Sequence, residues 1–395
     1  MFDKILQSSV QEFISNNESS DLNKLLLKGG EISEVPIKAI VEQIISRIKA
    51  KSKTPFLYHK EGIVYPPKIS MEQCSSEITA HYKAGLVRGK RGVDLTGGLG
   101  IDSYFLSKKF EHFDYVEQNN ELAALTTHNF LILGANNINS HNTSAETFIH
   151  SLEEPYDLIY LDPARRDEQQ KKVFMFEDCT PNIVRLAPDL FKKSDLIVVK
   201  ASPLVDIKLA IDELKNVHEV HVVAVNNECK ELLFVLRKDK CNDVSIVCSN
   251  YRASIWEKFE FKVSEEESAQ SNYSEIRNFI YEPNASILKS GGFKVVGQQL
   301  GLNKLHPNTH LYTSDQLQVD FPGRTFEVVD IIKYDKKAFA GVLKSNKANI
   351  TTRNFPDSVD KVRQKLRLKD GGSDYLFATT DKNDNKLIIL TKKVV

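Results

Sequence analysis

The chain has 395 residues, which is enough for two or three folded units of ordinary size. Its 41% hydrophobic and 27% charged residues are typical of a globular protein and exclude general disorder. The 53 basic residues equal the 53 acidic ones, which excludes a uniformly polybasic nucleic-acid coat. Five scattered cysteines form no C-x-x-C pair, and no apolar run has signal or membrane-spanning length, so we expect a soluble, cytoplasmic protein without a disulfide framework.

Residues 1–88 are predicted to form an N-terminal helical region. Between Ile37 and Ile48, isoleucine and valine recur at the spacing of one helical face. Ser70 and Gln73 match a capping box, which would open a further helix that runs to about Leu86. Nothing in the first 60 residues carries obvious chemistry, so we expect this region to serve as a scaffold.

Residues 89–240 change to short apolar runs that alternate with amphipathic stretches. Apolar runs of this length, separated by helical patterns, indicate a parallel sheet with helices on both faces. Only residues 226–231 separate the last two runs, so these strands are expected to pair antiparallel as a hairpin. The predicted fold class is therefore α/β, with a Rossmann-like seven-stranded sheet. Its expected strands are Gly92–Leu95, His112–Val116, Ile138–Asn142, Leu158–Leu161, Leu196–Val199, His221–Val225 and Leu232–Leu236.

Beyond residue 240 the predicted strands become mixed. Residues 264–274 are rich in Glu and Ser, and we expect them to form a loop or linker. A helical stretch is expected to follow Asn284 and to end near Gly301. The last segment is predicted to contain strands at Phe326–Ile332, Asn349–Asn354, Tyr375–Thr380 and Leu387–Thr391, with helices at Lys336–Leu343 and Val359–Leu368.

The charge is distributed unevenly along the chain. From Ile331 to Val395 there are 15 Lys and Arg residues against 7 Asp and Glu residues, a net charge of +8. Because the whole chain is neutral, the remainder carries −8. A small basic module on an acidic body is typical of polyanion binding, although an ordinary solvated helix face would have the same composition.

A glycine-rich stretch begins at Asp94, at the end of the first predicted strand of the sheet. Doubly wound sheets bind nucleotide-like ligands at this position, and glycines let the backbone approach a ligand closely. A carboxylate there would repel the pyrophosphate of a dinucleotide, which binds at the positive end of a helix. It suits a cationic group instead, such as the amino-acid and sulfonium portion of S-adenosylmethionine. The candidate cofactor-binding residues of this stretch are Asp94, Thr96, Gly97, Gly98 and Gly100.

Two later strand ends add candidates for the same ligand. Glu117 follows the next predicted strand, where an acidic side chain can accept hydrogen bonds from both hydroxyls of a ribose; it could instead flank a helix N-terminus. Ser144 and Ala145 follow the third strand and could contact an adenine ring, although a Ser/Thr cluster at this position also suits a helix cap. Together these positions favour a ligand that contains adenosine.

These motifs resemble the class I S-adenosylmethionine-dependent methyltransferases, through the glycine loop, Glu117, the Asp162-Pro163 corner and the closing hairpin. The loop is also similar to a family that methylates a guanine amino group in small-subunit ribosomal RNA. Over most of residues 70–395, the chain resembles a bacterial family of methyltransferase-like proteins with a C-terminal THUMP-like domain. The stretches that carry this second resemblance are Glu282–Ala285, Leu305–Tyr312 and Lys369–Phe377.

The resemblance implies a division into four parts. Residues 1–88 would be the helical region and residues 89–240 the methyltransferase domain. Residues 241–325 would hold connecting strands and a ferredoxin-like domain, and residues 326–395 a basic THUMP-like domain related to RNA-binding domains. S-adenosylmethionine is then the expected cofactor and structured RNA, ribosomal or transfer, the expected partner, with no metal and no membrane.

The resemblance places the chemistry at the strand-to-turn corner around Asp162. In relatives that methylate an amine, this corner reads Asp/Asn-Pro-Pro followed by an aromatic residue that stacks on a flipped base. Asp162 and Pro163 match and are the candidate catalytic residues, whereas Ala164 and Arg165 depart from the pattern. Methylation of uridine at carbon 5 needs a cysteine nucleophile after the next strand, where this chain has Lys200, so that reaction is disfavoured. We therefore expect transfer to a nitrogen or oxygen atom.

Three basic residues are candidates for substrate binding. Arg165 and Arg166 could bind a substrate phosphate with paired donors, or they could be neutralised by nearby acidic side chains. Lys200 ends the fifth predicted strand and could contact the substrate or pair with Asp162. The histidines lie in different predicted elements without the spacing of metal ligands, so no metal site is expected.

The function that these predictions favour is an S-adenosylmethionine-dependent methyltransferase acting on structured RNA. The altered corner after Asp162 motivates an alternative, a non-catalytic RNA-binding protein with a relic cofactor pocket. A nicotinamide-dependent oxidoreductase would share the sheet, but Asp94 and the closing hairpin weaken that interpretation. Protein or small-molecule methylation stays open, because the fold does not dictate the acceptor.

Overall fold

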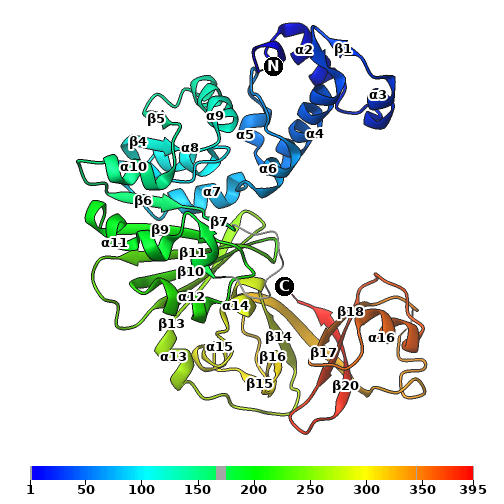
Figure 1. Ribbon diagram of the computed structural model, residues 1–395. Coiled ribbons are helices and arrows are strands. Elements are labelled where there is room, and N and C mark those ends of the chain that lie inside the picture. Colours follow the sequence, from blue (N-terminus) through cyan, green and yellow to red (C-terminus); the bar gives the residue numbers. More distant parts are fainter. Residues whose placement is uncertain (1, 166–174, 344, 395) are drawn as a thin grey trace. The chain divides into compact units, whose positions relative to one another are not determined.

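The computed structural model of the chain describes residues 2–165, 175–343 and 345–394 (Figure 1). The chain divides into two compact units. Unit 1 contains residues 1–218 and 232–241, and unit 2 contains residues 219–231 and 242–395. Unit 2 therefore includes a short segment from within the sequence of unit 1.

The N-terminal part of unit 1 is helical, as its pattern predicted. Helix α4 buries Ile40, Val41 and Ile44, which belong to the apolar repeat. The predicted capping box is wrong: Ser70 lies inside α6, and Ser76 caps α7 by accepting a hydrogen bond from the N–H of Thr79 at 3.2 Å. The elements are α1 (Phe2–Ile5), α2 (Ser8–Asn16), α3 (Leu22–Lys28), β1 (Glu31–Ile32), β2 (Val35–Pro36), α4 (Ile37–Lys53), α5 (Pro55–Tyr58), α6 (Lys68–Gln73) and α7 (Glu77–Ala84).

The strands of unit 1 follow the order β11-β9-β6-β3-β4-β5. They are β3 (Gly89–Asp94), β4 (Phe110–Val116), β5 (Ile138–His141), β6 (Leu158–Leu161), β9 (Leu196–Ala201) and β11 (Glu228–Arg237). The first five are parallel to one another, whereas β11 runs antiparallel to β9, as predicted. In the described residues the complete sheet has nine strands rather than the seven predicted, because β12 (Ser245–Arg252) and β13 (Ile255–Lys262) extend it beyond β10 (Val217–Val225). The chain moves outward from β3 to β5 and then returns to β6. The carboxyl ends of β3 and β6 therefore border the switch point at which such sheets bind ligands.

Helices cover this sheet on both faces. Because crossovers between parallel strands are right-handed, the helices that lead outward from β3 lie on one face and those that follow β5 lie on the other. The first group is α8 (Ile101–Ser107) and α9 (Asn120–Leu133), and the second is α10 (Ala145–Ser151), α11 (Ile183–Lys193) and α12 (Ile207–Leu214). Helix α7 packs against α8, and the N-terminal helices share one apolar core with α8 and α9. The region before β3 therefore supports the first group of helices.

Unit 2 begins in a hairpin. Strand β10 (Val217–Val225) is next to β11 in the sheet, and the two-residue turn between them has positive φ angles at Asn226 and Asn227, 52° and 63°. Strand β10 pairs in parallel with β12 (Ser245–Arg252), and β12 pairs antiparallel with β13 (Ile255–Lys262). Helix α13 (Val263–Ser268) follows, so the predicted loop is wrong over its first half. The helix starts there because the Glu265 carboxylate accepts a hydrogen bond from the N–H of Lys262.

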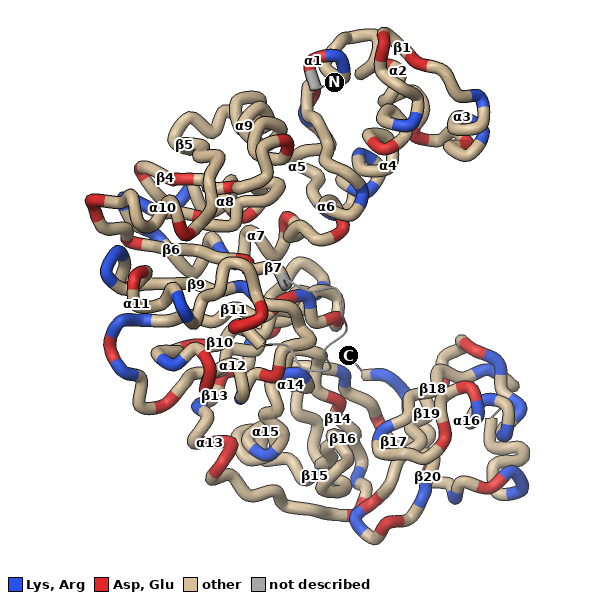
Figure 2. Tube along the Cα trace, in the orientation of Figure 1, with Lys and Arg blue, Asp and Glu red and all other residues tan. Residues whose placement is uncertain are grey.

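A seven-stranded sheet in the order β15-β16-β14-β17-β20-β19-β18 forms the rest of unit 2. Its strands and helices are β14 (Phe279–Pro283), α14 (Ala285–Ser290), α15 (Val295–Gln299), β15 (Asn303–His306), β16 (Thr309–Ser314), β17 (Gly323–Lys333), β18 (Asn349–Arg353), α16 (Val359–Leu366), β19 (Asp374–Thr380) and β20 (Lys386–Lys393). Strand β17 pairs with both β14 and β20 and so joins the two halves of the sheet. Figure 2 shows basic and acidic residues interspersed along these strands and around α16.

The segment between β17 and β18 differs from its prediction. A helix was expected over residues 336–343, but residues 336–341 form turns. The Asp335 carboxylate accepts hydrogen bonds from the N–H groups of Lys337 and Ala338, as a helix cap would. Gly341 then has a φ of 79°, which is outside the helical region. The strands predicted for the last segment, and its second helix α16, are all present.

Candidate functional site

The glycine loop joins β3 to α8 at the carboxyl edge of the unit 1 sheet. Gly98 and Gly100 have φ angles of 53° and 71°, a conformation that favours glycine, and Gly100 is the N-cap of α8. Gly97 lies against Tyr115, so that a Cβ atom at residue 97 would be 2.1 Å from a ring carbon. The Tyr115 hydroxyl donates a hydrogen bond to the carbonyl of Gly98 at 2.6 Å. The loop is therefore held flat against β4, with its backbone free to approach a ligand.

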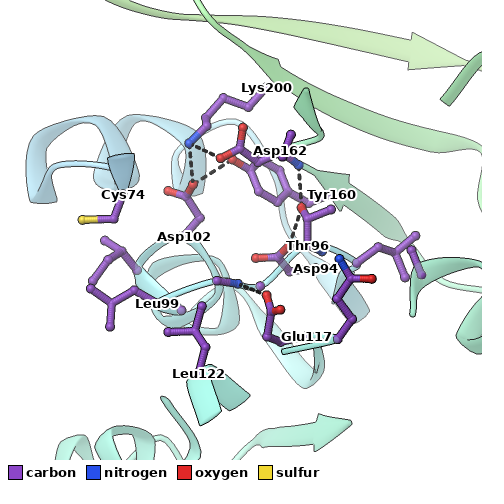
Figure 3. A pocket seen from close by; sticks show the side chains of 18 of the residues that line it. Cys74, Asp94, Thr96, Leu99, Asp102, Glu117, Leu122, Tyr160, Asp162 and Lys200 are labelled. Atoms are coloured by element: carbon purple, nitrogen blue, oxygen red, sulfur yellow. Dashed lines mark hydrogen bonds and ion pairs between the residues drawn. The ribbon is translucent and has the colours of Figure 1, made fainter. Parts of the chain in front are cut away.

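This loop borders a cavity of about 320 Å³ (Figure 3). The carboxyl ends of β3, β4, β6 and β9 contribute to its lining, together with the loops that follow β5 and precede α7. Most of the predicted site residues share this cavity. Those that line it are Asp94, Thr96, Gly97, Gly98, Gly100, Glu117, Ala145, Asp162 and Lys200.

Asp94 is almost fully buried in this lining, with 1% of its surface exposed. Its carboxylate accepts hydrogen bonds from Ser103 Oγ at 2.6 Å and from the N–H of Thr96 at 3.0 Å. Burial raises the pKa of Asp94 to about 7, and these hydrogen bonds offset only part of the rise. Within the described ranges, no basic side chain lies at ion-pair distance from Asp94. A carboxylate in such a place is stabilised by a cation, so the cavity suits a ligand with a positively charged group.

Glu117 and Thr96 connect neighbouring strand ends to the loop. The Glu117 carboxylate accepts hydrogen bonds from the N–H of Gly98 at 2.9 Å and from the N–H of Asn119 at 2.7 Å, so it lies against the glycine loop (Figure 3). Asn119, rather than Glu117, is the N-cap of α9. The Thr96 hydroxyl accepts a hydrogen bond from the N–H of Asp162 at 2.6 Å. The predicted cofactor residues and the predicted catalytic corner are therefore one hydrogen-bonded assembly.

Lys200 bridges two carboxylates at the edge of the cavity. Its Nζ atom lies 2.5 Å from Asp162 Oδ2 and 3.7 Å from Asp102 Oδ2 (Figure 3). The Lys200 and Asp102 side chains are 10% and 9% exposed, whereas the Asp162 side chain is 38% exposed. Asp162 is thus the member of this group that a substrate can reach. Lys200 contacts Asp162, as one of its two predicted roles required.

Asp102 is the centre of a buried network behind Lys200. Lys83 Nζ lies 3.2 Å from Asp102 Oδ1, and the hydroxyls of Ser75 and Tyr160 donate hydrogen bonds to Asp102 Oδ2, both at 2.8 Å. Burial would raise the pKa of Asp102, but the charges of the two lysines and the two hydrogen bonds lower it below its usual range. Asp102 is therefore ionised, and the network fixes the position of Lys200.

Among the remaining predicted residues, Ser144 and Pro163 do not line the cavity. Ser144 is the N-cap of α10, where its hydroxyl accepts a hydrogen bond from the N–H of Thr147 at 3.2 Å. Pro163 is buried beside the corner. Arg165 ends β7 (Ala164–Arg165), which pairs antiparallel with β8 (Cys179–Thr180). Arg166 lies outside the described residues.

Sequence reasoning missed three members of the site. Asp102, Lys83 and Tyr160 were given no role, although all three belong to the buried network. Asp102 stands in the first turn of a helix, where acidic residues are common for reasons unrelated to ligands. Lys83 and Tyr160 lie within a helical and an apolar strand pattern that explain them equally well. No signal in the sequence separates these residues from ordinary members of their elements.

In the described part of the chain, no group of three or more His, Cys, Asp or Glu side chains is arranged to hold a metal ion. The five cysteines are free thiols. Among the helices of the described ranges, none has the length and hydropathy needed to cross a bilayer.

Two family models match the C-terminal part of the chain. A ferredoxin-like domain model matches residues 279–322, and a THUMP domain-like model matches residues 323–393. No curated protein gives a significant match to the chain. Two solved structures match less than half of the chain. A "putative methyltransferase" of Streptococcus mutans in complex with SAH is 12% identical, covers 42% of this chain and 99% of its own, and has a TM-score of 0.30. An rRNA methylase of Streptococcus thermophilus is 15% identical, with coverages of 41% and 94% and a TM-score of 0.31.

One solved structure matches over the whole length. It comes from Porphyromonas gingivalis W83, is described as a "putative methyltransferase", and is 32% identical. The match covers 100% of this chain and 99% of that one, with a TM-score of 0.87. This agreement and the two domain matches confirm the predicted fold class and the predicted resemblance. The chain therefore belongs to the family of this Porphyromonas gingivalis protein, in which a methyltransferase-type sheet is followed by ferredoxin-like and THUMP-like domains.

Proposed function

We propose that the protein is an S-adenosylmethionine-dependent methyltransferase that acts on structured RNA, at a nitrogen or oxygen atom. The observation that carries the proposal is the buried Asp94 carboxylate, which faces the cavity without a cationic partner in the described residues. S-adenosylmethionine brings a sulfonium and an ammonium group to such a position, and it supplies a methyl group already activated for transfer. A dinucleotide would bring its diphosphate to the same carboxylate, which is unfavourable. Membership in the family supports the same assignment.

The residues around the loop fit the parts of this cofactor. Asp94 would pair with the cationic methionine end, and the absence of side chains at Gly97 and Gly98 lets the backbone approach it closely. Glu117 would accept hydrogen bonds from the ribose hydroxyls. Ala145 lines the cavity after β5 and would contact the adenine, whereas the Ser144 hydroxyl already caps α10.

Asp162 would receive the acceptor group of the substrate. Its carboxylate contacts Lys200, and its N–H donates to Thr96, so its orientation is fixed while part of the side chain stays exposed. An ionised carboxylate here accepts a hydrogen bond from an N–H or O–H group, directs that atom's lone pair, and takes up the proton that the atom loses. Lys200 is held by two carboxylates and would act through Asp162 by fixing the position of its carboxylate.

The assignment of RNA as the substrate depends on the C-terminal domains. Residues 323–393 match a THUMP domain-like model, and the segment from Ile331 to the last residue carries a net charge of +8. RNA-binding modules neutralise backbone phosphates with Lys and Arg, which agrees with this excess.

Isothermal titration of the full chain with S-adenosylmethionine tests the cofactor assignment. We expect binding by the native protein and an affinity about 30-fold lower, or weaker still, for Asp94→Asn, because the variant removes the charge that pairs with a desolvated cation. Asp195→Asn is the matched control in unit 1, since the Asp195 side chain is 86% exposed, and it should bind as the native protein does. No binding by the native protein, or unchanged affinity in Asp94→Asn, would contradict the assignment.

Methyl transfer from labelled S-adenosylmethionine to total cellular RNA tests the reaction. We expect labelled RNA with the native protein, and at least a hundredfold less label with Asp162→Ala at unchanged cofactor affinity, because the acceptor's proton then has no base. Modified nucleosides in RNA from cells with and without the protein would identify the product.

A second candidate function has its own support. Ala164 lines the cavity at the corner where relatives that methylate amines have the second proline of their motif. If the native protein binds both S-adenosylmethionine and RNA but transfers no label, the protein is an RNA-binding protein with a relic cofactor pocket.

A further inference from the structure

A buried ion triad lies within the seven-stranded sheet of unit 2. The Glu282 side chain is 3% exposed, and its carboxylate contacts the guanidinium groups of Arg324 and Arg353. Arg324 Nε donates to Glu282 Oε2 at 2.7 Å, and Arg353 Nη2 lies 2.7 Å from Glu282 Oε1. Glu282 and Arg324 are register partners on β14 and β17, and Arg353 ends β18. One carboxylate therefore holds two arginines from different strands, and the triad has a net positive charge.

Two further cations lie beside the triad. Lys393 ends β20. It is the register partner of Phe326 on β17, two residues beyond Arg324. Burial and the charges of Arg252 and Arg324 lower the pKa of Lys393, which agrees with this placement. In the described ranges, neither Arg252 nor Lys393 has a carboxylate at ion-pair distance. We call Glu282, Arg252, Arg324, Arg353 and Lys393 the Arg–Lys cluster.

Within the described residues, the positive charge of the Arg–Lys cluster exceeds the negative charge beside it. It contains four cations and one carboxylate, and that carboxylate is already shared by Arg324 and Arg353. Like charges held this close repel one another, and a bound anion relieves the repulsion. The side chains of Arg324 and Arg353 are 29% and 37% exposed, so part of each remains open to solvent. Guanidinium groups bind phosphate through paired donors, which makes phosphate the anion that suits this surface.

Two other basic residues of the THUMP-like domain are neutralised or covered locally. Arg363 in α16 contacts both Asp360 and Asp370 at 2.8 Å. The ammonium group of Lys365 lies over the ring of Tyr334, 3.6 Å from its centre. The charges of Arg363 and Lys365 are therefore less available to a bound anion than those of the Arg–Lys cluster.

We propose that the Arg–Lys cluster binds phosphodiester groups of an RNA backbone. The inference rests on the proposed function, in which RNA is the substrate, and it names the surface that holds that substrate. Because Glu282 fixes Arg324 and Arg353 before RNA arrives, less side-chain freedom is lost on binding. Arg252 and Lys393, at the ends of β12 and β20, contact adjoining phosphates. Contacts to phosphate supply affinity and orientation without reading the base sequence.

The test is binding of the full chain to a fluorescein-labelled RNA hairpin, followed by anisotropy over a range of KCl concentrations. The double variant Arg252→Gln/Lys393→Gln should bind about tenfold more weakly, and the slope of log Kobs against log[KCl] should fall by about 2, because two phosphate contacts are lost. Arg252 and Lys393 are chosen for substitution because, among the described residues, neither forms an ion pair with Glu282. Removal of Arg324 would deprive the buried Glu282 carboxylate of one of its two arginine partners and could unfold the protein.

Lys336→Gln/Lys361→Gln is the matched control, since it removes the same charge from two exposed positions of the THUMP-like domain. It should change the affinity by about twofold at most, with the salt slope nearly unchanged. Equal losses in the two double variants would overturn the proposal in favour of net charge alone. Absence of hairpin binding by the native protein at low salt would overturn it as well.

Two parallel titrations distinguish RNA from a small phosphate ligand, and distinguish this proposal from the methyltransferase proposal. Inorganic tripolyphosphate should bind far more weakly than the hairpin; if it binds as tightly and loses affinity in Arg252→Gln/Lys393→Gln, the cluster takes a small phosphate ligand and the RNA assignment is wrong. Affinity for S-adenosylmethionine should be the same in all variants. If the native protein fails to bind S-adenosylmethionine but binds the hairpin through the cluster, the methyltransferase proposal fails and this one stands.

Discussion

Asp102→Asn is expected to lower the free energy of unfolding of unit 1 by about 3–5 kcal/mol, the usual cost of breaking a buried ion pair by removing one partner. The ionised carboxylate lies 3.2 Å from the ammonium group of Lys83 and 3.7 Å from that of Lys200. Asparagine removes the negative charge but leaves Lys83 with a side chain that is 1% exposed. Loss of this negative charge raises the cost of keeping the ammonium group of Lys83 buried in its charged form.

Hydrogen exchange of the amides in β3 and β6, followed as urea is added, measures this loss within unit 1. Asp195→Asn again provides the control, because Asp195 also forms an ion pair, 3.6 Å from Lys238, but is 86% exposed. Its loss should be about 0.5 kcal/mol or less. A decrease of under about 1 kcal/mol in Asp102→Asn would mean that the network positions Lys200 without stabilising the fold.

The affinity for S-adenosylmethionine is expected to fall about 50-fold between pH 7 and pH 5. Burial raises the pKa of Asp94 to about 7, so about half of the carboxylate is ionised at pH 7 and about 1% at pH 5. The cationic end of the cofactor binds to the ionised form. Binding in acid must therefore expel a proton from Asp94, and the affinity decreases in proportion to the ionised fraction.

The same raised pKa has the opposite consequence for the free protein. Between the ordinary value of 3.8 and about 7, the folded state holds more protons than the unfolded state, so the contribution of Asp94 to stability falls as the pH rises through this window. Titration calorimetry at several pH values, with Asp94→Asn beside the native protein, tests both statements. The variant should bind weakly but equally at pH 5 and pH 7. A pH dependence that persists in Asp94→Asn would contradict the assignment of this titration to Asp94.

The part of the site that the sequence could predict consists of strand ends. Asp94, Glu117 and Asp162 each follow an apolar run, and a parallel sheet brings such positions to one edge. Their shared cavity therefore follows from the fold class. The contact of Asp102 with Lys83 does not, because it depends on how α7 packs against α8. Packing between helices is a property of the whole core, and no local pattern encodes it.

The misassigned elements have a similar cause. Residues 264–274 have the composition of a loop, yet α13 is stabilised from a distance, because the Glu266 carboxylate accepts hydrogen bonds from the N–H groups of Lys294 and Val295. Residues 336–343 have a helical pattern, but Phe339 alone is fully buried in the neighbouring core, and one anchored turn does not sustain a helix. In both segments the outcome was decided by contacts made outside the window that the pattern describes.

The hairpin of β10 and β11 places residues 219–231 of unit 2 between the two sequence segments of unit 1. No single cleavage of the polypeptide therefore separates the two units. Residues 219–225 of β10 pair with β12, whereas residues 232–237 of β11 return to β9. A fragment ended at residue 241 would keep β10 and lose β12, which would leave a bare strand edge prone to aggregation. A fragment that keeps this whole sheet must therefore extend at least to the end of β13 at Lys262.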